Sequence, residues 1–296
     1  GGYDTTSRIV ARYLGKHIPG NPTVIVQNVP GAGSMKVANY VFNAAPKDGT
    51  VLAVFSSSVA VQPLYGNKKA KFETSRFEWI GSMHTDIQSC GVWKGAGRGI
   101  RTLPDLLAAK EPIVFGATSP ASPTSQFPLF LKNVLGANIK VITGYKGTKG
   151  INLAMQRGEV QGTCGMYESS VRGAFANDFK SGNLNLFMQV GIDRTAPFFG
   201  KATQVYKTLK THEQRQIAEL IFRPAELTRP LAAPPGTPKD RVAALRKALL
   251  DAMKDPALIA EGKRIGIDFK AMSGERVAGL MASFYKASPE LLKKAH

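Results

Sequence analysis

The chain opens with Gly1-Gly2-Tyr3-Asp4-Thr5-Thr6-Ser7-Arg8, and the rest of the sequence is interpreted from this stretch. Two glycines let the backbone turn tightly and approach a ligand closely, and Asp and Thr are common helix-capping residues. Apolar residues then recur at helical spacing from Ile9 to Ile18. The stretch predicts a glycine loop that opens a helix. The free N–H groups of such a helix end can bind a carboxylate or phosphate; an ordinary capped surface helix is the alternative.

Length and composition indicate a globular chain. The 296 residues suffice for two domains of about 150 residues each, and contents of 43% hydrophobic and 20% charged residues are typical of globular proteins. No run of 18 apolar residues occurs, so no membrane span is expected. No signal peptide is recognised at the start. Because a strand normally leads into such a loop, we expect a processed or trimmed N-terminus.

The charge balance is strongly basic. Lys and Arg number 39 against 21 Asp and Glu, a formal net charge of +18. Such a balance suggests anionic partners. The basic residues are scattered, however, with no run of five like charges and no aromatic–basic alternation typical of an RNA-binding sheet. We therefore expect a solvated basic surface that attracts anionic ligands, and no nucleic-acid partner.

Motifs of catalysis and metal binding are missing from the sequence. It contains no G-x-S-x-G and no H-E-x-x-H. Its four histidines are far apart and neither cysteine lies in a C-x-x-C, so we expect no metal site and no cofactor. We therefore do not expect an enzyme. An enzyme with an unmarked site remains an alternative, because a catalytic triad needs no fixed spacing.

Strand-like runs alternate with polar loops and helical patterns. The runs lie at 23–29, 50–55, 77–83, 87–93, 112–117, 140–142, 160–164, 184–190 and 231–233. Such alternation predicts α/β domains with parallel sheets flanked by helices. Hydroxyl-rich loops follow three of the runs, at 56–58, 118–124 and 143–150. Ligands of open α/β sheets bind at the carboxyl ends of strands, so these loops are candidate binding loops.

Six short stretches match, in order, the motifs of one family. The opening matches G-G-x-D-x-x-x-R, and residues 26–33 match V-x-N-x-P-G-A-G. The others are 45–52 (A-P-D-G-Y-T-L with one insertion), 144–147 (P-Y-K-G), 158–160 (G-x-V) and 231–238 (A-P-x-G-T-P). In this order they resemble the periplasmic solute-binding proteins of tripartite tricarboxylate transporters, the TctC or Bug family.

The resemblance implies a two-domain α/β fold of the Venus-flytrap type, with parallel-rich sheets flanked by helices and with crossing hinge strands. Domain 1 is expected to comprise residues 1–97 and 231–296, and domain 2 residues 98–230. The resemblance also implies a periplasmic protein whose signal peptide has been removed. It would capture a small organic di- or tricarboxylate, or an aromatic carboxylate, in an interdomain cleft and deliver it to integral-membrane transporter subunits. We expect a monomer. A ligand sensor of the same fold is the alternative.

The family's ligand loops, carried onto this chain, give a set of expected ligand-binding residues. Domain 1 would supply Gly2, Tyr3, Asp4, Thr5, Ser56 and Ser57, with Asp4 shaping the loop. Domain 2 would supply Thr118, Ser119, Ser122, Tyr145, Lys146, Gly147 and Thr148. Lys146 is the one cation expected near the ligand, with a solvated loop lysine as the alternative.

The sequence departs from the family at some positions. Many relatives carry an amine-binding Asp near position 165, which is Gly here; this favours a plain carboxylate over an amino acid. The family's first strand is absent ahead of the glycine loop, and residues 200–225 form a longer, more helical segment. In a periplasmic protein Cys90 and Cys164 can form a disulfide; a disulfide and two buried free thiols both remain open.

Overall fold

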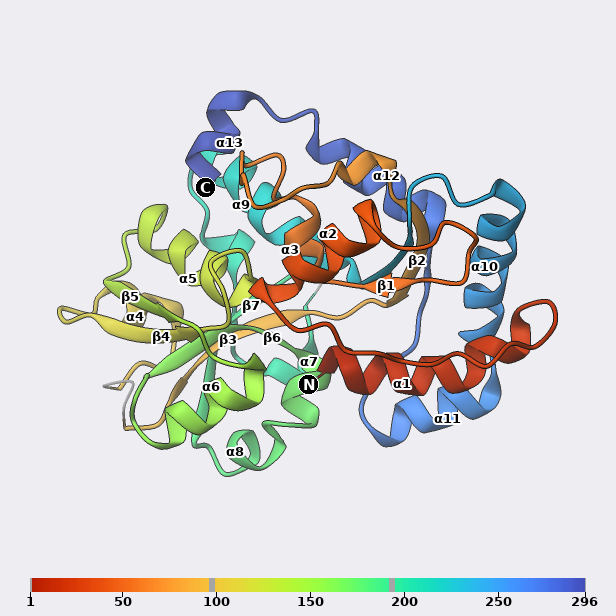
Figure 1. The fold of residues 1–296 in the computed structure, drawn as a ribbon. Helices are drawn as coiled ribbons and strands as arrows, with labels where there is room; N and C mark the ends of the chain where they lie inside the picture. Colours follow the sequence, from red (N-terminus) through yellow and green to blue (C-terminus); the bar gives the residue numbers. More distant parts are fainter. Residues whose placement is uncertain (1, 96–98, 192–194, 296) are drawn as a thin grey trace. The chain divides into compact units, whose positions relative to one another are not determined.

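The computed structural model describes residues 2–95, 99–191 and 195–295 (Figure 1). The chain divides into two compact units: unit 1 comprises residues 1–85 and 227–289, and unit 2 comprises residues 86–226 and 290–296. The chain passes from unit 1 to unit 2 after residue 85, whereas the sequence analysis placed this boundary after residue 97. The chain returns to unit 1 after residue 226, whereas the sequence analysis placed this return after residue 230.

The C-terminal helix differs from the expected division, because residues 290–296 belong to unit 2 and not to the first domain. Helix α13 (Pro289–Ala295) places Leu291 and Ala295 against the hydrophobic core of unit 2. Lys294 forms ion pairs with Glu213 of the same unit and with Glu290 one helical turn before it. The helix therefore belongs to unit 2 because its apolar side chains are buried there and because Lys294 pairs with Glu213.

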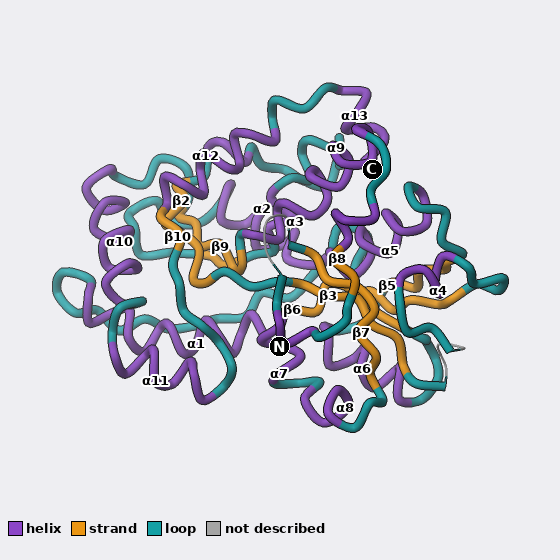
Figure 2. The backbone as a smooth tube through the Cα atoms, turned by 180° about the vertical axis from the view of Figure 1, so that it is seen from behind, coloured by secondary structure: helices purple, strands orange, loops and turns teal. Residues whose placement is uncertain are grey.

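Unit 1 contains a four-stranded sheet of order β1-β9-β2-β10 (Figure 2). The strands are β1 (Ala53–Val54), β2 (Glu78–His84), β9 (Thr228–Ala233) and β10 (Met272–Ser273). Each described pair is antiparallel, so the expected parallel pairing is wrong for this sheet. The reason is non-local. β1 and β2 follow each other in the sequence and run in the same direction, but β9 returns from the second half of the chain and lies between them.

One face of this sheet is covered by three helices, α1 (Gly2–Leu14), α10 (Lys239–Ala252) and α11 (Pro256–Arg264). Their apolar residues form one core cluster with the strands, including Ile9, Leu14 and Leu249. The expected glycine loop at the start is wrong, because the helix already begins at Gly2. Asp4, Thr5 and Thr6 therefore lie inside the helix and do not cap it.

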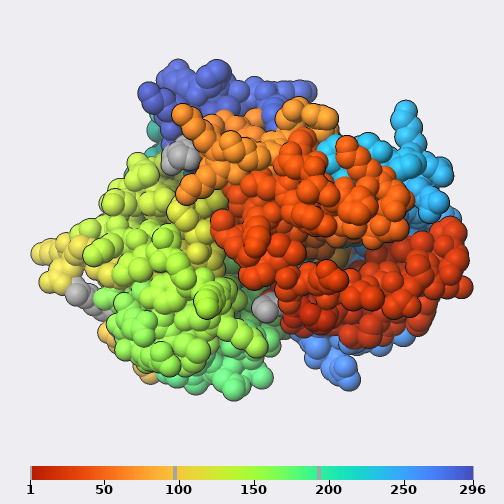
Figure 3. Space-filling model, viewed as in Figure 1, coloured from red at the N-terminus to blue at the C-terminus, as the bar shows by residue number. Residues whose placement is uncertain are grey.

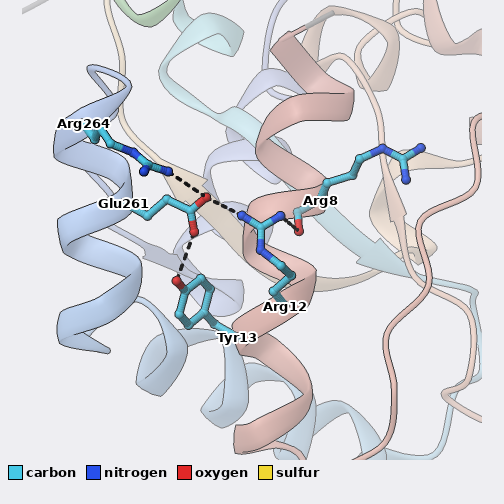
Figure 4. A network of polar contacts seen from close by, with 5 residues as sticks. All are labelled: Arg8, Arg12, Tyr13, Glu261 and Arg264. Carbon is cyan, nitrogen blue, oxygen red and sulfur yellow. Dashed lines mark hydrogen bonds and ion pairs between the residues drawn. The ribbon is translucent and has the colours of Figure 1, made fainter.

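A network of polar contacts joins α1 to α11 (Figure 4). The Glu261 carboxylate accepts a hydrogen bond from Tyr13 Oη at 3.0 Å and pairs with Arg12, while Arg264 lies 3.9 Å away. Arg12 also donates to the carbonyl of Arg8 at 3.3 Å. These contacts hold α1 against α11, and they thereby help to fix the position of the N-terminus of α1 within unit 1.

The strand expected at 23–29 does not form. The segment is extended, yet no neighbouring strand pairs with it in the described part of unit 1, and Ile25 is 77% exposed. A β-type sequence forms a strand only when a neighbour accepts its hydrogen bonds. Helix α2 (Met35–Asn43) follows the glycine turn at residues 31–33. The remaining helices of unit 1 are α3 (Ser57–Ala60) and α12 (Gly274–Phe284).

Unit 2 contains a six-stranded mixed sheet of order β5-β4-β6-β3-β7-β8. The strands are β3 (Gln88–Trp93), β4 (Ile113–Ala117), β5 (Ile139–Thr143), β6 (Gly162–Tyr167), β7 (Leu184–Val190) and β8 (Thr203–Gln204). β4 pairs in parallel with β5 and β6, and β7 with β8. β3 runs antiparallel to both of its neighbours.

Helices cover the two faces of this sheet. One core cluster contains residues of α4 (Leu103–Leu107), α5 (Pro123–Asn133) and α9 (His212–Phe222). The other contains residues of α6 (Gly147–Gln156) and α7 (Glu168–Arg172), with α8 (Ala176–Lys180) beside it. Capping boxes precede α4 and α9: Thr102 pairs with Asp105, and Thr211 with Gln214.

Cys90 and Cys164 form a disulfide between the neighbouring strands β3 and β6. Both residues are fully buried in the core cluster that also contains α5. The bond joins positions 74 residues apart in the sequence, so it closes a large loop within unit 2. Of the two possibilities left open by the sequence, the structure contains the disulfide.

Candidate functional site

The three parallel strands β5, β4 and β6 end at the same edge of the sheet in unit 2, and each leads into a helix. The helices are α6, α5 and α7, respectively. Helix N-termini carry unpaired N–H groups and partial positive charge. The structure therefore gathers three helix N-termini of unit 2 at one sheet edge, the arrangement in which α/β proteins bind ligands.

Helix α5 begins at Pro123 and has no acidic residue in its first turn. In the loop before it, hydroxyl side chains form hydrogen bonds with the backbone of the same loop. Thr124 Oγ1 accepts the Thr118 N–H at 2.9 Å, and Ser122 Oγ donates to the Ser119 carbonyl at 2.7 Å. Thr118 and Ser122 thus hold the loop in shape through hydrogen bonds within it.

Ser119 differs from its neighbours in this loop. Its side chain is 6% exposed, and its Oγ has no hydrogen-bond partner. Leaving a buried hydroxyl unpaired costs about 1–3 kcal/mol. A ligand oxygen at the N-terminus of α5 would remove this cost, so Ser119 is the predicted residue whose environment best fits a ligand contact.

The loop after β5 lies next to the loop after β4. The Tyr145 N–H donates to the carbonyl of Ala117, at the end of β4, at 3.2 Å, and the Tyr145 ring packs partly buried on the core that contains α6. Lys146 and Gly147 are exposed at the start of α6, and Thr148 is half-buried in its first turn. No acidic residue occurs in that turn. In the space-filling view the green atoms of this helix and its loop are open to solvent (Figure 3).

The third helix N-terminus at this edge is already occupied by a carboxylate. Asp86 accepts the N–H groups of Glu168 at 3.0 Å and Ser169 at 3.2 Å, the first two residues of α7. Of the three helices that begin at this sheet edge, α5 and α6 therefore have no acidic group at their N-termini. Sequence reasoning missed the role of Asp86, because its helix lies more than 80 residues further along the chain.

In unit 1 the expected residues Gly2, Tyr3, Asp4 and Thr5 form the first turn of α1. Asp4 accepts hydrogen bonds from Asn28 at 2.8 Å and from Arg8 at 2.9 Å. The hydrogen bond from Asn28, supported by Arg8, lowers the pKa of Asp4 below its usual value. Asp4 is therefore ionised in the first turn of α1, and its negative charge would repel a second anion there.

Two buried hydroxyl groups of unit 1 lack hydrogen-bond partners. Thr6 Oγ1 lies on α1, one residue beyond the expected set, while Thr5 is exposed. Ser57 Oγ lies at the start of α3, after Ser56, which occupies the N-cap position. Of the residues expected to bind the ligand, Ser56 and Ser57 are buried and Thr5 is exposed.

A buried cation lies beside the predicted residue Tyr3. The Arg229 guanidinium, 1% exposed, is 5.5 Å from the centre of the Tyr3 ring and contacts the imidazole of His84. Burial, together with the charge of Arg229, lowers the pKa of His84 well below its usual value, so the imidazole is neutral at pH 7. α3 packs against β9, the strand that carries Arg229. Sequence reasoning missed Arg229; the signal was a charged residue next to Pro230, directly before the apolar run at 231–233.

The described residues contain no group of three or more His, Cys, Asp or Glu side chains placed to hold a metal ion. Within the same residues, every helix is too short or too polar to cross a membrane. The N-termini of α5 and α6 at the sheet edge of unit 2 offer hydroxyl and N–H groups, which suit a small anion.

The solved structures that are similar to the whole chain include the following three. The periplasmic binding protein BugD is 20% identical, covers 100% of this chain and 93% of its own, and has a TM-score of 0.75. MatC from Rhodopseudomonas palustris with bound malate is 17% identical over 99% and 95%, with a TM-score of 0.71. A further Rhodopseudomonas palustris protein, with adipate, is 16% identical over 99% and 92%, with a TM-score of 0.69.

These similarities confirm the expected fold class, two α/β units with helix-flanked sheets as in periplasmic binding proteins. A comparison with proteins of curated function found no match. A comparison with protein families matched residues 7–296 to the tripartite tricarboxylate transporter family receptor, TctC. With nearly its whole length matched, the chain belongs to the TctC family of solute-binding proteins.

Proposed function

We propose that this protein binds a small organic carboxylate at the N-termini of α5 and α6 in unit 2, and that it delivers this ligand to the membrane subunits of a tripartite tricarboxylate transporter. The observation that carries the proposal is the sheet edge of unit 2. Two of its three helix N-termini have no acidic residue in the first turn, and the buried Ser119 hydroxyl there is unpaired. Relatives of the same fold that hold malate and adipate support the ligand class.

The energetics are consistent with reversible binding. Each hydrogen bond to a charged group contributes about 1.5–3 kcal/mol. A few such bonds from N–H groups and from Ser119, reduced by the cost of immobilising the ligand, correspond to micromolar affinity, or about −8 kcal/mol. We expect the ligand to be a di- or tricarboxylate, with an aromatic carboxylate as a second class. Gly165 supplies no acidic group for a ligand amine.

The family and the disulfide support a periplasmic location. Disulfides persist in oxidising compartments such as the bacterial periplasm, and the Cys90–Cys164 bond is fully buried in the core of unit 2. We propose that the protein acts there as a monomeric carrier without catalytic activity. Incubation with each bound carboxylate should return the ligand chemically unchanged, and turnover of the ligand would contradict this role.

The function is tested by thermal shift against a panel of di-, tri- and aromatic carboxylates, with amino acids and sugars as comparison ligands. We expect at least one carboxylate to raise the melting temperature, and native mass spectrometry to find a carboxylate in material purified without denaturation. Stabilisation by amino acids or sugars alone would contradict the proposal. Ser119→Ala should weaken carboxylate binding about tenfold. It should not lower the melting temperature of the free protein and should raise it, because the unpaired buried hydroxyl is removed.

A further inference from the structure

Gln88, the first residue of β3, is a buried polar residue that the proposed function leaves unexplained. Its side chain is 1% exposed, and both its amide oxygen and its amide nitrogen lack hydrogen-bond partners. Buried amides normally use both groups, since each unpaired one has lost its water. The position was missed in the sequence analysis because a single Gln in a strand-like run carries no motif.

Strand pairing places Gln88 at the sheet edge of the candidate site. It lies opposite Tyr167, the last residue of β6. Two residues earlier on the same strand, Gly165 lies against the first turn of α5: a β-carbon built there would be 3.1 Å from the backbone nitrogen of Thr124. Two strand residues span about 7 Å, so Gln88 is within side-chain reach of the N-terminus of α5.

Gln88 also faces the same side of the sheet as α5. It pairs with Val190 of β7 and Cys90 pairs with Met188, in regular register between these positions. Val190, Cys90 and Met188 all belong to the core cluster that contains α5. Because side chains alternate along a strand, Gln88 shares their face. Two further buried hydroxyls without partners, those of Ser119 and Ser125, lie at the start of α5.

We propose that Gln88 is a specificity-determining residue that binds a second polar group of the ligand, one that both donates and accepts hydrogen bonds. A carboxylate only accepts, so it can satisfy the amide nitrogen of Gln88 but not the oxygen. A hydroxyl group can satisfy both. The inference, which rests on the proposed function, is that the preferred ligands are hydroxy-carboxylates and that Gln88 selects them over the corresponding unsubstituted acids.

Matched pairs of acids that differ by one hydroxyl test this selection: malate and succinate, citrate and tricarballylate, mandelate and phenylacetate. Calorimetric titration of the wild type should favour the hydroxy acid of at least one pair by about tenfold or more, since a site built for a hydroxyl rejects the analogue without it. Gln88→Leu should remove most of that preference by weakening the hydroxy acid, while the plain acid changes little. The matched control is Gln216→Leu, at an exposed position of α9, which should keep the preference.

The outcomes separate the inference from the function on which it rests. Equal binding of both members of every bound pair, or a preference that survives in Gln88→Leu, overturns the role of Gln88 and leaves carboxylate binding intact. Binding of no acid in the panel overturns both. A crystal structure in which one buried water satisfies Gln88 with and without ligand would also overturn the inference, whereas a ligand hydroxyl within hydrogen-bond distance of the amide would establish it.

Discussion

Loss of the Cys90–Cys164 disulfide should destabilise unit 2 selectively. The bond closes a loop across a sequence separation of 74 residues. In the chain-entropy description, such a closure removes roughly 15 cal/mol/K from the unfolded state, or about 4 kcal/mol at room temperature. With a urea dependence of about 2 kcal/mol per molar, the unfolding midpoint of unit 2 should fall by about 2 M. Refolding the wild-type chain under reductant removes the disulfide without substituting either cysteine, so no cavity is created in the core.

The two tryptophans allow each unit to be followed separately. Trp79 lies in β2 of unit 1 and Trp93 at the end of β3 of unit 2. Urea unfolding of Trp79→Phe reports on unit 2, and that of Trp93→Phe reports on unit 1. We expect reduction to shift the transition reported by Trp93 far more than that reported by Trp79. An unchanged Trp93 transition after complete reduction, verified by thiol titration, would refute the stabilising role of the disulfide.

Two further predictions concern the pH dependence of stability and the packing of the site. The pKa of His84 is lowered mainly by burial, so its stabilising contribution is complete above pH 6.5 and is lost as the pH falls, by up to about 1.4 kcal/mol per pH unit. Urea titrations at several pH values should show a flatter pH dependence of stability for His84→Gln than for the wild type, and equal slopes for the two proteins would contradict this. Gly165→Ala combines a positive φ of 71° with a contact of 3.0 Å to Pro123, so it should cost more stability than Gly182→Ala, where φ is 72° and no neighbour lies within 4 Å. Gly165→Ala should also weaken carboxylate binding by displacing the start of α5, and equal losses in stability and affinity for the two glycine variants would contradict the proposed packing.

Local features of the fold were predictable from the sequence. The strand at 184–190, the start of α5 at Pro123 and the capping boxes at Thr102 and Thr211 all depend on residues within a few positions of one another. Hydrophobic periodicity and capping chemistry are sufficient there. The loops after β4 and β5 were also identified as candidate sites, because hydroxyl residues follow a strand in each.

The remaining features depend on long-range pairing. The position of β9 between β1 and β2, and the absence of a strand at 23–29, follow from which segments become neighbours, and no local pattern encodes this. The same holds within the candidate site. Asp86 occupies a helix end far along the chain, and the importance of Gln88 comes from the residues opposite it on other strands. The chemistry of each side chain could be predicted from the sequence, whereas the residues that it contacts in the fold could not.

The central claim, that a carboxylate binds at helix N-termini of unit 2 that lack acidic groups, is tested most directly by placing a carboxylate there. Thr148→Asp puts an acidic group in the first turn of α6, where it should stabilise the helix by about 0.3–1 kcal/mol. As a control for the added charge, Ala257→Asp places an acidic group in the first turn of α11 in unit 1, a helix whose N-terminus is already capped by the Asp255 carboxylate. Calorimetric titration with the carboxylate that stabilises the wild type most should show affinity reduced about tenfold or more in Thr148→Asp, through repulsion between like charges, and unchanged in Ala257→Asp. Equal affinity in the two variants would contradict the account.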